Sequence, residues 1–487
     1  MVNLTEQSDA SLVEQVMRAI QTKIDRRQYT PGTRIPSVRA MAESMSVSKS
    51  TVVEAYSRLT AGGIVQARLG SGFYVAAPLA PLDLAELSPE TDPTIDPLWI
   101  MRQALRPGDE HMRPGCGWLP ESWMPHEAMR KALRATARDG DGMTLFEYGP
   151  AQGLETLRGL ITRRLHDQGV EAAPEQVMLT DSCTQAIDLL CRFLLEPGDT
   201  VVVDDPCYFN FKALLRAHRA NVVGVPYTPT GPDLTAFAAV LEAHRPRIYL
   251  TNSGLQNPTG ATLTAAVAHR LLKISASHDV VIVEDDIFGD FEEQPAPRLA
   301  AFDGLDRVIR VGSFSKTLSA SVRCGYIASR PDWIRALSDL RMVTGMASSP
   351  FNAELLASML MDGSYRRHME RVRTRLARQR QIVATKLADL GIEPVLEPAG
   401  GMFLWCRLPR GCDAAQVARH ALTENVVLAP GNAFSAGADA TGLMRFNVTH
   451  TDDKRVYDVL KRAIAATAKT SSSARRKLTD VSRTPGS

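Results

Sequence analysis

No run of apolar residues in this sequence approaches the roughly 18 that a membrane-spanning helix needs. The opening stretch MVNLTEQSDASLVEQ is polar and has no apolar segment of the kind found in secretion signals. The 7 cysteines are scattered without a C-x-x-C pair, which argues against a disulfide framework and a zinc knuckle. We therefore expect a cytoplasmic protein with reduced thiols, no membrane partner and no bound metal.

Net charge is also nearly absent. Lys and Arg number 56 and Asp and Glu 54, which gives +2 and excludes a chain that is basic throughout. Any nucleic-acid site must then be confined to a local module. Hydrophobic residues at 44% and charged residues at 23% are ordinary for folded proteins and exclude a wholly disordered or fibrous chain. A length of 487 residues favours two or three domains over one.

Proline marks the division of the chain. Five prolines fall between residues 77 and 97, amid small and acidic residues that cannot sustain a long helix or a central strand. The last residues are polar and basic with no periodicity. We expect an N-terminal domain over 1–76, a Pro-rich linker over 77–108, a large domain over 109–466 and a disordered basic tail over 467–487.

Short helical patterns fill the N-terminal region. Apolar side chains recur at helical spacing over 12–24. Ser37 and Ser48 are N-caps for two more short helices with a very short turn between them. Residues 64–67 and 73–75 are typical of a hairpin. The pattern favours a helix-turn-helix with a wing, although a small helical domain with ordinary surface charges fits the periodicity equally well.

The net positive charge of this region is small, but some of its basic residues lie where they could contact phosphate. Residues 1–75 carry nine basic side chains and six acidic ones. Arg34, Arg39 and Lys49 sit at the starts of the second and third helices, where cations and helix N-termini together favour phosphate.

The stretch PGTRIPSVRAMAESMSVSKSTVVEAYSRLTAGGIVQARLGSGFYV resembles the winged helix-turn-helix of GntR-type transcription regulators over nearly its whole length. The resemblance implies an operator DNA partner. Arg34 and Arg39 would contact the DNA backbone or groove. The recognition helix would open with Ser48, Lys49, Ser50 and Thr51, and the wing tip near the minor groove would hold Gly70 and Ser71.

The large domain alternates strand-like runs with helices. Polar residues directly follow three of these runs, at 177–179, 280–283 and 308–311. Residues 180–185 follow the first and could hold an anion at a helix start, or simply cap that helix. The triplet 284–286 follows the second and could be a solvated loop, a divalent-metal site, or one carboxylate that holds a proton on a cofactor nitrogen. Lys316, crowded by small hydroxyl residues after the third, could form a Schiff base or lie on a Ser-rich surface turn.

The motifs occur in the order seen in fold-type I, class I aminotransferases, and the similarity spans roughly residues 110–465. These motifs are Tyr148-Gly149-Pro150, Ser182-x-Thr184-Gln185, Asp205-Pro206-x-Tyr208, Asn257-Pro258-Thr259-Gly260, Glu284-Asp285-Asp286, Ser313-Phe314-Ser315-Lys316, Arg323 and Arg445. With the N-terminal module, the chain resembles the MocR subfamily of GntR regulators. The resemblance implies a winged helix-turn-helix fused to an α/β, aminotransferase-like domain that depends on pyridoxal 5'-phosphate.

Roles at the cofactor follow from the same resemblance. Lys316 would be the Schiff-base lysine, and Asp285 would pair with the pyridine nitrogen and keep the ring an electron sink. Asn257 would bond the 3-oxygen of the ring, and Tyr208 would stack on its face.

The phosphate and the substrate would have separate partners. Ser182, Thr184, Ser313 and Arg323 would hold the phosphate, with Tyr148 reaching it from the second subunit of a homodimer. Arg445 would take the carboxylate of an amino acid or a related small-molecule effector.

Two departures favour sensing over fast catalysis. Class I enzymes commonly place a tyrosine shortly after the aspartate, whereas Ile287 and Phe288 offer no hydroxyl. Cys183 stands where glycine is usual. We therefore expect a regulator that senses pyridoxal phosphate, an amino-acid-like effector, or both, with weak or no transaminase turnover. The alternative is a working aminotransferase with an accessory DNA-binding module.

Seven arginines between residues 366 and 380 are the remaining feature. They could contact DNA, but a solvated face of a long helix is the simpler interpretation, and we adopt it.

Overall fold

The computed structural model describes residues 11–26, 28–30, 32–68, 71–76, 101–102, 105, 111–139, 145–435 and 437–481. The chain divides into two compact units, Met1–Asp83 and Leu84–Ser487. The division falls within the stretch expected to be a linker, most of which lies outside the described residues. Each unit is described by itself.

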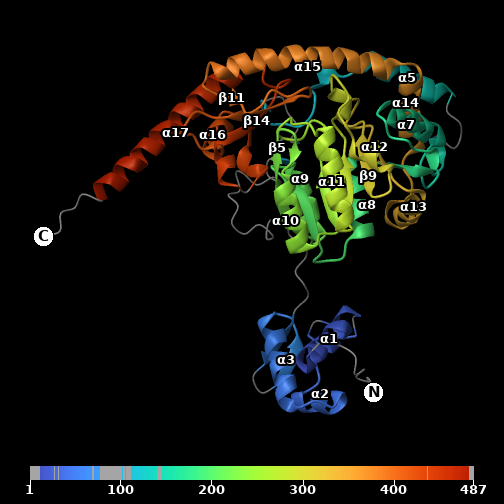
Figure 1. The fold of residues 1–487 in the computed structure, drawn as a ribbon, viewed down its shortest axis with the longest axis vertical. Helices are drawn as coiled ribbons and strands as arrows, with labels where there is room; N and C mark the ends of the chain where they lie inside the picture. The colour runs from blue at the N-terminus through green and yellow to red at the C-terminus, as the bar shows by residue number, and fades with distance from the viewer. Residues whose placement is uncertain are drawn as a thin grey trace. The chain divides into compact units, whose positions relative to one another are not determined.

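In its described residues, the N-terminal unit has three helices and a hairpin (Figure 1). The elements are α1 (Leu12–Asp25), α2 (Val38–Met45), α3 (Lys49–Ala61), β1 (Val65–Arg68) and β2 (Gly72–Val75). Ser37 and Ser48 cap α2 and α3 as expected, since the hydroxyls accept from the N–H groups of Ala40 and Thr51. One small apolar core, which includes Val16, joins the helices to the hairpin.

The large unit is built on an eight-stranded sheet with the order β3-β10-β9-β8-β7-β4-β5-β6. Strands β9, β8, β7, β4 and β5 pair in parallel, whereas β10 is antiparallel to β3 and β9, and β6 is antiparallel to β5. The strands are β3 (Val177–Thr180), β4 (Thr200–Asp205), β5 (Asn221–Thr228), β6 (Gly231–Pro232), β7 (Ile248–Thr251), β8 (Val281–Asp285), β9 (Val308–Ser313) and β10 (Gly325–Ala328).

Helices cover both faces of this sheet. Consecutive residues of a strand point to opposite faces, and on each face they pack in a separate hydrophobic core. Val202 of β4 packs in one core, whereas Val201 and Val203 pack in the other. The first core holds α7 (Glu155–Asp167), α10 (Leu234–His244), α11 (Ala265–Ser277), α12 (Leu299–Asp303) and α14 (Pro350–Met361), and the second holds α8 (Cys183–Leu194), α9 (Phe209–Ala217) and α13 (Pro331–Gly345). The result is a helix–sheet–helix arrangement.

A smaller four-stranded sheet completes the unit, with the order β11-β12-β14-β13. Its elements are β11 (Glu393–Pro394), β12 (Phe403–Arg407), β13 (Ala429–Pro430), β14 (Leu443–Asn447), α16 (Ala414–Leu422) and α17 (Lys454–Val481). The long helix α15 (Ser364–Ala388) runs from the side of α5 (His126–Asp139) to the side of β11 (Figure 1). Short 3-10 turns lie at Glu121–Trp123, Pro174–Gln176, Gly289–Phe291, Gly431–Ala433 and Ala438–Gly442.

The C-terminal segment differs from the expected disordered tail. Helix α17 continues to Val481, so residues 467–481 extend a helix, and residues 482–487 lie outside the described part. No Pro or Gly occurs between 467 and 481, so no residue there interrupts the helix. Among the described helices, none is both long and apolar enough to cross a bilayer.

Candidate functional site

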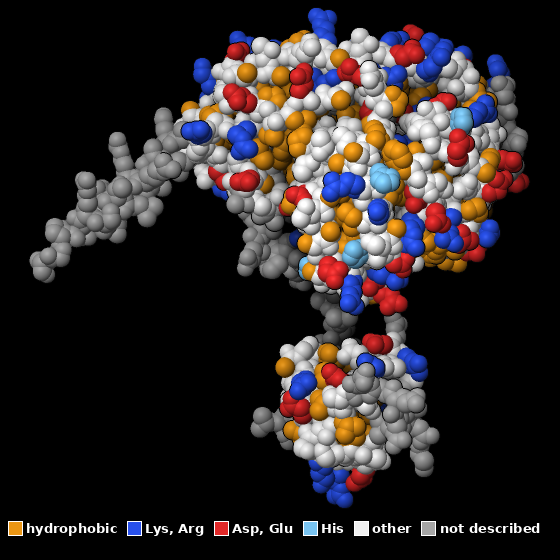
Figure 2. All heavy atoms as spheres, in the orientation of Figure 1, with side chains coloured by type: hydrophobic (Ala, Val, Ile, Leu, Met, Phe, Trp, Pro, Cys, Tyr) orange, Lys and Arg blue, Asp and Glu red, His pale blue; other side chains and the backbone are white. Residues whose placement is uncertain are grey.

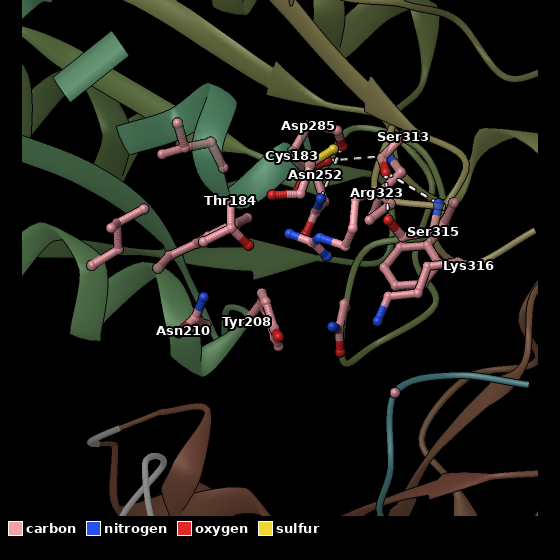
Figure 3. Close-up of a pocket in the computed structure, with 18 residues that line it drawn as sticks. Cys183, Thr184, Tyr208, Asn210, Asn252, Asp285, Ser313, Ser315, Lys316 and Arg323 are labelled. Carbon is pink, nitrogen blue, oxygen red and sulfur yellow. Dashed lines mark hydrogen bonds between the residues drawn. The ribbon is translucent and has the colours of Figure 1, made fainter. Parts of the chain in front are cut away.

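The candidate site lies where parallel strands of the large sheet end. Tyr208 lies in the loop after β4, Asn252 follows β7, Asp285 ends β8, and Lys316 follows β9. These side chains and the start of α8 line a cavity of about 120 Å³ (Figure 3). Its other lining residues include Gly117, Ser182, Cys183, Thr184, Asn210, Asn257, Ile287, Phe288, Ser313, Ser315 and Arg323.

A tight turn holds Lys316 at the cavity. Ser313 donates its hydroxyl to the carbonyl of Cys324 at 2.9 Å and accepts from the backbone N–H of Ser315 at 3.1 Å. Burial lowers the pKa of Lys316 to about 8, and the positive charge of Arg445 acts in the same direction. Lys316 therefore has a larger neutral, nucleophilic fraction near neutral pH than an exposed lysine has.

Asp285 is buried opposite this amine and keeps its charge through hydrogen bonds. Its carboxylate accepts from the backbone N–H of Ile287 at 3.1 Å, and Asn252 donates to its carbonyl at 2.8 Å. Burial raises the pKa of Asp285 to about 6, and hydrogen bonds from Ile287, Asn252 and Cys183 limit the rise. The carboxylate is thus mostly ionised at neutral pH. The thiol of Cys183 is a donor that the sequence did not reveal.

The start of α8 and the turn before Lys316 form a cradle suited to an anion. Ser182 caps α8, because its hydroxyl accepts from the N–H of Gln185 at 3.0 Å. Thr184 lies in the first turn of the same helix. Arg323 lines the cavity (Figure 3), and within the described ranges no carboxylate lies at ion-pair distance from it. Hydroxyls, a helix N-terminus and an uncompensated guanidinium together favour a phosphate.

Arg445 is a second cation without a carboxylate partner in the described chain. It is 1% exposed, and its Nη atoms donate to the side-chain oxygen of Asn257 and to the carbonyl of Gly115, both at 2.7 Å. Its guanidinium stacks on Phe403 and Phe434. Burial lowers the pKa of Arg445 to about 10, although the group stays charged at neutral pH.

Gly117 lies between the amine and this guanidinium. A Cβ at Gly117 would be 3.8 Å from Lys316 Nζ and 4.0 Å from Arg445 Nη2. The two cationic groups therefore face the same small space. That space suits a molecule with one carboxylate and a group that reacts with the amine.

Two predicted residues are not among the lining of this cavity. Arg445 lies beside the lining rather than in it. Tyr148, which was predicted to serve the site of a second subunit, is 76% exposed, and its predicted role stays a prediction. Ile287 and Phe288 do line it, so the position expected to lack a hydroxyl faces the site. Sequence reasoning missed Asn210, Asn252 and Ser315 as lining residues. The polar pair Asn252-Ser253 directly after the buried strand β7 was the signal that could have revealed Asn252.

The predicted DNA-contact residues of the N-terminal unit lie at two places. Ser48 Oγ is within 2.8 Å of Ser50 Oγ and Thr51 Oγ1, so the hydroxyls at the start of α3 bond one another while Lys49 stays exposed. Arg39 pairs with Glu43 at 3.1 Å on the exposed face of α2.

At the hairpin, the side chain of Arg34 lies close to the backbone of the wing. A Cβ at Gly72, where φ is +108°, would be 3.3 Å from Arg34 Nε, so the wing backbone approaches this guanidinium closely. Ser71 Oγ lies 2.6 Å from Tyr74 Oη. Gly70, the other predicted wing residue, lies outside the described residues.

Two family models match the chain, one for each unit, and relatives match across both units. The model of the bacterial regulatory proteins of the gntR family matches residues 12–75, and the model of aminotransferase class I and II matches residues 119–462. The chain is 29% identical to an uncharacterized HTH-type transcriptional regulator, YdcR of Escherichia coli, over 93% of this chain and 97% of the relative. It is 28% identical to the HTH-type transcriptional regulator NorG of Staphylococcus aureus over 82% and 92%.

A solved structure shares the fold of the large unit. LysN, an alpha-aminoadipate aminotransferase from Thermus thermophilus, was solved in complex with N-(5'-phosphopyridoxyl)-L-leucine. It superposes with a TM-score of 0.69 at 27% identity and covers 76% of this chain and 95% of its own.

The pH dependence of Lys316 reactivity tests its burial. In cofactor-free protein, we expect reductive methylation of Lys316 by formaldehyde and a borane to rise with pH around a midpoint of about 8, because only the neutral amine attacks. A lysine in water has its midpoint at about 10.4. Peptide mass spectrometry gives the extent at each pH, with the exposed lysines of the same digest as the control. A midpoint for Lys316 equal to theirs would contradict the buried site.

Proposed function

This chain belongs to the class I and II aminotransferase family and carries a gntR-type regulatory domain ahead of it, the arrangement of the MocR subfamily, and we propose that it is a transcription regulator that senses pyridoxal 5'-phosphate, an amino-acid-like effector, or both. One observation carries the proposal: a helix-turn-helix unit and a site with an amine, a carboxylate and two uncompensated guanidinium groups occur in one chain. Because its partner is chromosomal DNA, the proposal includes a cytoplasmic location.

The residues present fit pyridoxal phosphate. Arg323, which has no ion-pair partner among the described residues, lies with Ser313 and the start of α8 where the phosphate would bind. Lys316 and Asp285 would meet the aldehyde and the ring nitrogen, while Tyr208 would pack on the ring. When bound, the group supplies an aldehyde that condenses with primary amines and a ring that withdraws electrons from them.

With the cofactor bound, the surrounding side chains would determine which chemistry takes place at the site. The neutral fraction of Lys316 provides the nucleophile, and the ionised Asp285 holds a proton at the ring nitrogen. Arg445 orients an effector by its carboxylate. Phe288 packs edge-on against Phe403, with ring centroids 5.4 Å apart, and supplies no proton to the ring oxygen. This missing donor favours slow chemistry over rapid turnover.

A working aminotransferase is the second candidate function. The set of Lys316, Asp285, Asn257 and Arg445 supports it, and LysN, with the same fold, is named as an aminotransferase. In that case the DNA-binding unit would be accessory.

A lysine substitution combined with a turnover assay separates the two functions. Lys316→Ala should abolish both the absorption band of bound cofactor and borohydride labelling at position 316, while operator binding stays measurable; Lys386→Ala, on the surface, is the control. For the wild-type protein, we expect no more than about one keto acid per site from candidate amino acids. Sustained multiple turnover would favour the enzyme, and labelling elsewhere in the Lys316→Ala protein would refute the assigned site.

The N-terminal unit should bind DNA through the start of α3. Lys49→Ala should weaken binding to the DNA upstream of the gene in a gel shift, and should reduce the slope of log affinity against log salt by about 1, since one phosphate contact is lost. Lys23→Ala, on α1 and stacked over Tyr29, is the matched control. Unchanged affinity and slope in Lys49→Ala would count against the proposed reading surface.

An exposed apolar patch supports the proposed homodimer. Phe146 and Val343 are 87% and 82% exposed. Tyr148 lies on the same chain segment as Phe146, and Met346 on the same segment as Val343. The segments are neighbours, because a Cβ at Gly149 would meet the ring of Pro350 at 2.9 Å. Patches of this kind mark protein interfaces. A dimer through this patch would let Tyr148 serve the site of the partner.

Charge placed in the patch should separate the subunits. Val343→Glu should shift the wild-type dimer toward monomer in light scattering, because burying an unpaired carboxylate in the interface costs several kcal/mol, or about a hundredfold or more in affinity. Phe302→Glu, at a side chain that is 53% exposed on α12, should leave the mass unchanged. If Phe302→Glu gave monomers and Val343→Glu did not, the interface would lie elsewhere.

A further inference from the structure

A second cavity, here called the α15 groove, lies between the first turns of α5 and the N-terminal half of α15. Its volume is about 580 Å³, and it shares no lining residue with the site around Lys316. Its lining includes Trp123, Lys131, Arg367, His368, Arg371 and Arg375. Figure 2 shows Lys and Arg side chains spread along the edge of the molecule where α15 runs.

The groove has an excess of positive charge. Four lining side chains are Lys or Arg, whereas Glu127 is the one carboxylate among the lining residues. Lys131 pairs with Asp362 at 3.1 Å. Arg367, Arg371 and Arg375 have no carboxylate at ion-pair distance within the part of the chain that the structure describes. Three guanidinium groups in one concavity repel one another, and an anion between them would offset that repulsion.

Two of these cations are held in place by neutral contacts. The guanidinium of Arg375 lies over the ring of Trp123, 3.9 Å from its centroid. Arg367 donates to the carbonyl of Asp362 and to the hydroxyl of Ser364. Neither contact neutralises charge, so both guanidinium groups are positioned and still available to an anion.

The shape of the groove favours a small ligand over a duplex. Cavities of roughly 300–1000 Å³ with an apolar wall are typical of small-molecule sites, and here Trp123 and Val372 form part of the wall. Arg378 is on the same helix and is also exposed, but it does not line the groove.

We propose that the α15 groove binds a small anion that carries adjacent phosphate groups, of the diphosphate or triphosphate class. Guanidinium groups bind phosphate oxygens in pairs, and the N-termini of α5 and α15 add positive potential at the same place.

The groove also borders the turn that carries Lys316. His368, a lining residue, donates from Nε2 to the carbonyl of Thr317 at 2.8 Å, because a carbonyl oxygen only accepts. Helix α15 therefore contacts the proposed ligand and the residue next to Lys316.

Calorimetry with sodium pyrophosphate on full-length, cofactor-loaded protein tests the proposal, since the loaded cofactor fills the other phosphate site. We expect wild-type protein to bind, and Arg371→Gln and Arg375→Gln each to weaken binding about tenfold or more, because each removes a charge-assisted contact. Arg378→Gln is the matched control and should change affinity less than about twofold. Arg371→Lys keeps the charge and should retain part of the affinity, which distinguishes loss of charge from loss of fold.

Three outcomes would overturn the proposal. Wild-type protein that gives no heat with pyrophosphate would do so, as would equal affinities in Arg371→Gln and Arg378→Gln. The third is a gel shift in which Arg371→Gln weakens binding to duplex DNA while pyrophosphate does not bind, which would make the groove a nucleic-acid contact.

Discussion

The position of Asp285 depends on the two carboxylates that flank it. Glu284 points to the other side of β8, where it accepts from Ser253 Oγ at 2.5 Å and from the backbone N–H of Leu299 at 2.8 Å. Asp286 forms buried ion pairs with Arg298, at 2.9 Å, and with Arg310. A slip of one residue along β8 would exchange these partners and leave buried charges unpaired, at a cost of several kcal/mol. The network therefore presents the middle carboxylate, and neither neighbour, to the cavity.

The same network positions Lys316. Arg310 lies on β9, so its ion pair with Asp286 ties β9 to the end of β8, where Asp285 faces Val311 in the parallel register. Three residues past β9, the turn places the amine in the cavity. Helix α15 holds the other side of this turn, because Tyr365 donates to Thr317 Oγ1 at 2.9 Å and His368 bonds the Thr317 carbonyl. Fixing both sides of the turn limits how far Lys316 can move.

Local motifs could be predicted from the sequence, and distant partners could not. The caps at Ser37 and Ser48 and the residues after β8 and β9 depend on near neighbours, so their patterns were sufficient. The triplet 284–286 left three interpretations open, because only tertiary partners show that all three carboxylates are buried. The bond between Arg445 and Asn257 joins residues 188 apart and has no local signature. The helix over 467–481 was missed because its composition resembles a disordered tail.

Arg445 can couple ligand binding to the arrangement of the two sheets of the large unit. It lies on β14 of the smaller sheet, yet it donates to Asn257, which follows β7 of the larger sheet. Its present partners are neutral, so a ligand carboxylate would offer a stronger one and would compete with Asn257 for the guanidinium. A ligand shifts a conformational equilibrium only by its difference in affinity between two states. Because this competition changes the bond between the two sheets, carboxylate binding would differ in energy between arrangements of those sheets, which is the property that a sensor requires and a rigid binding pocket lacks.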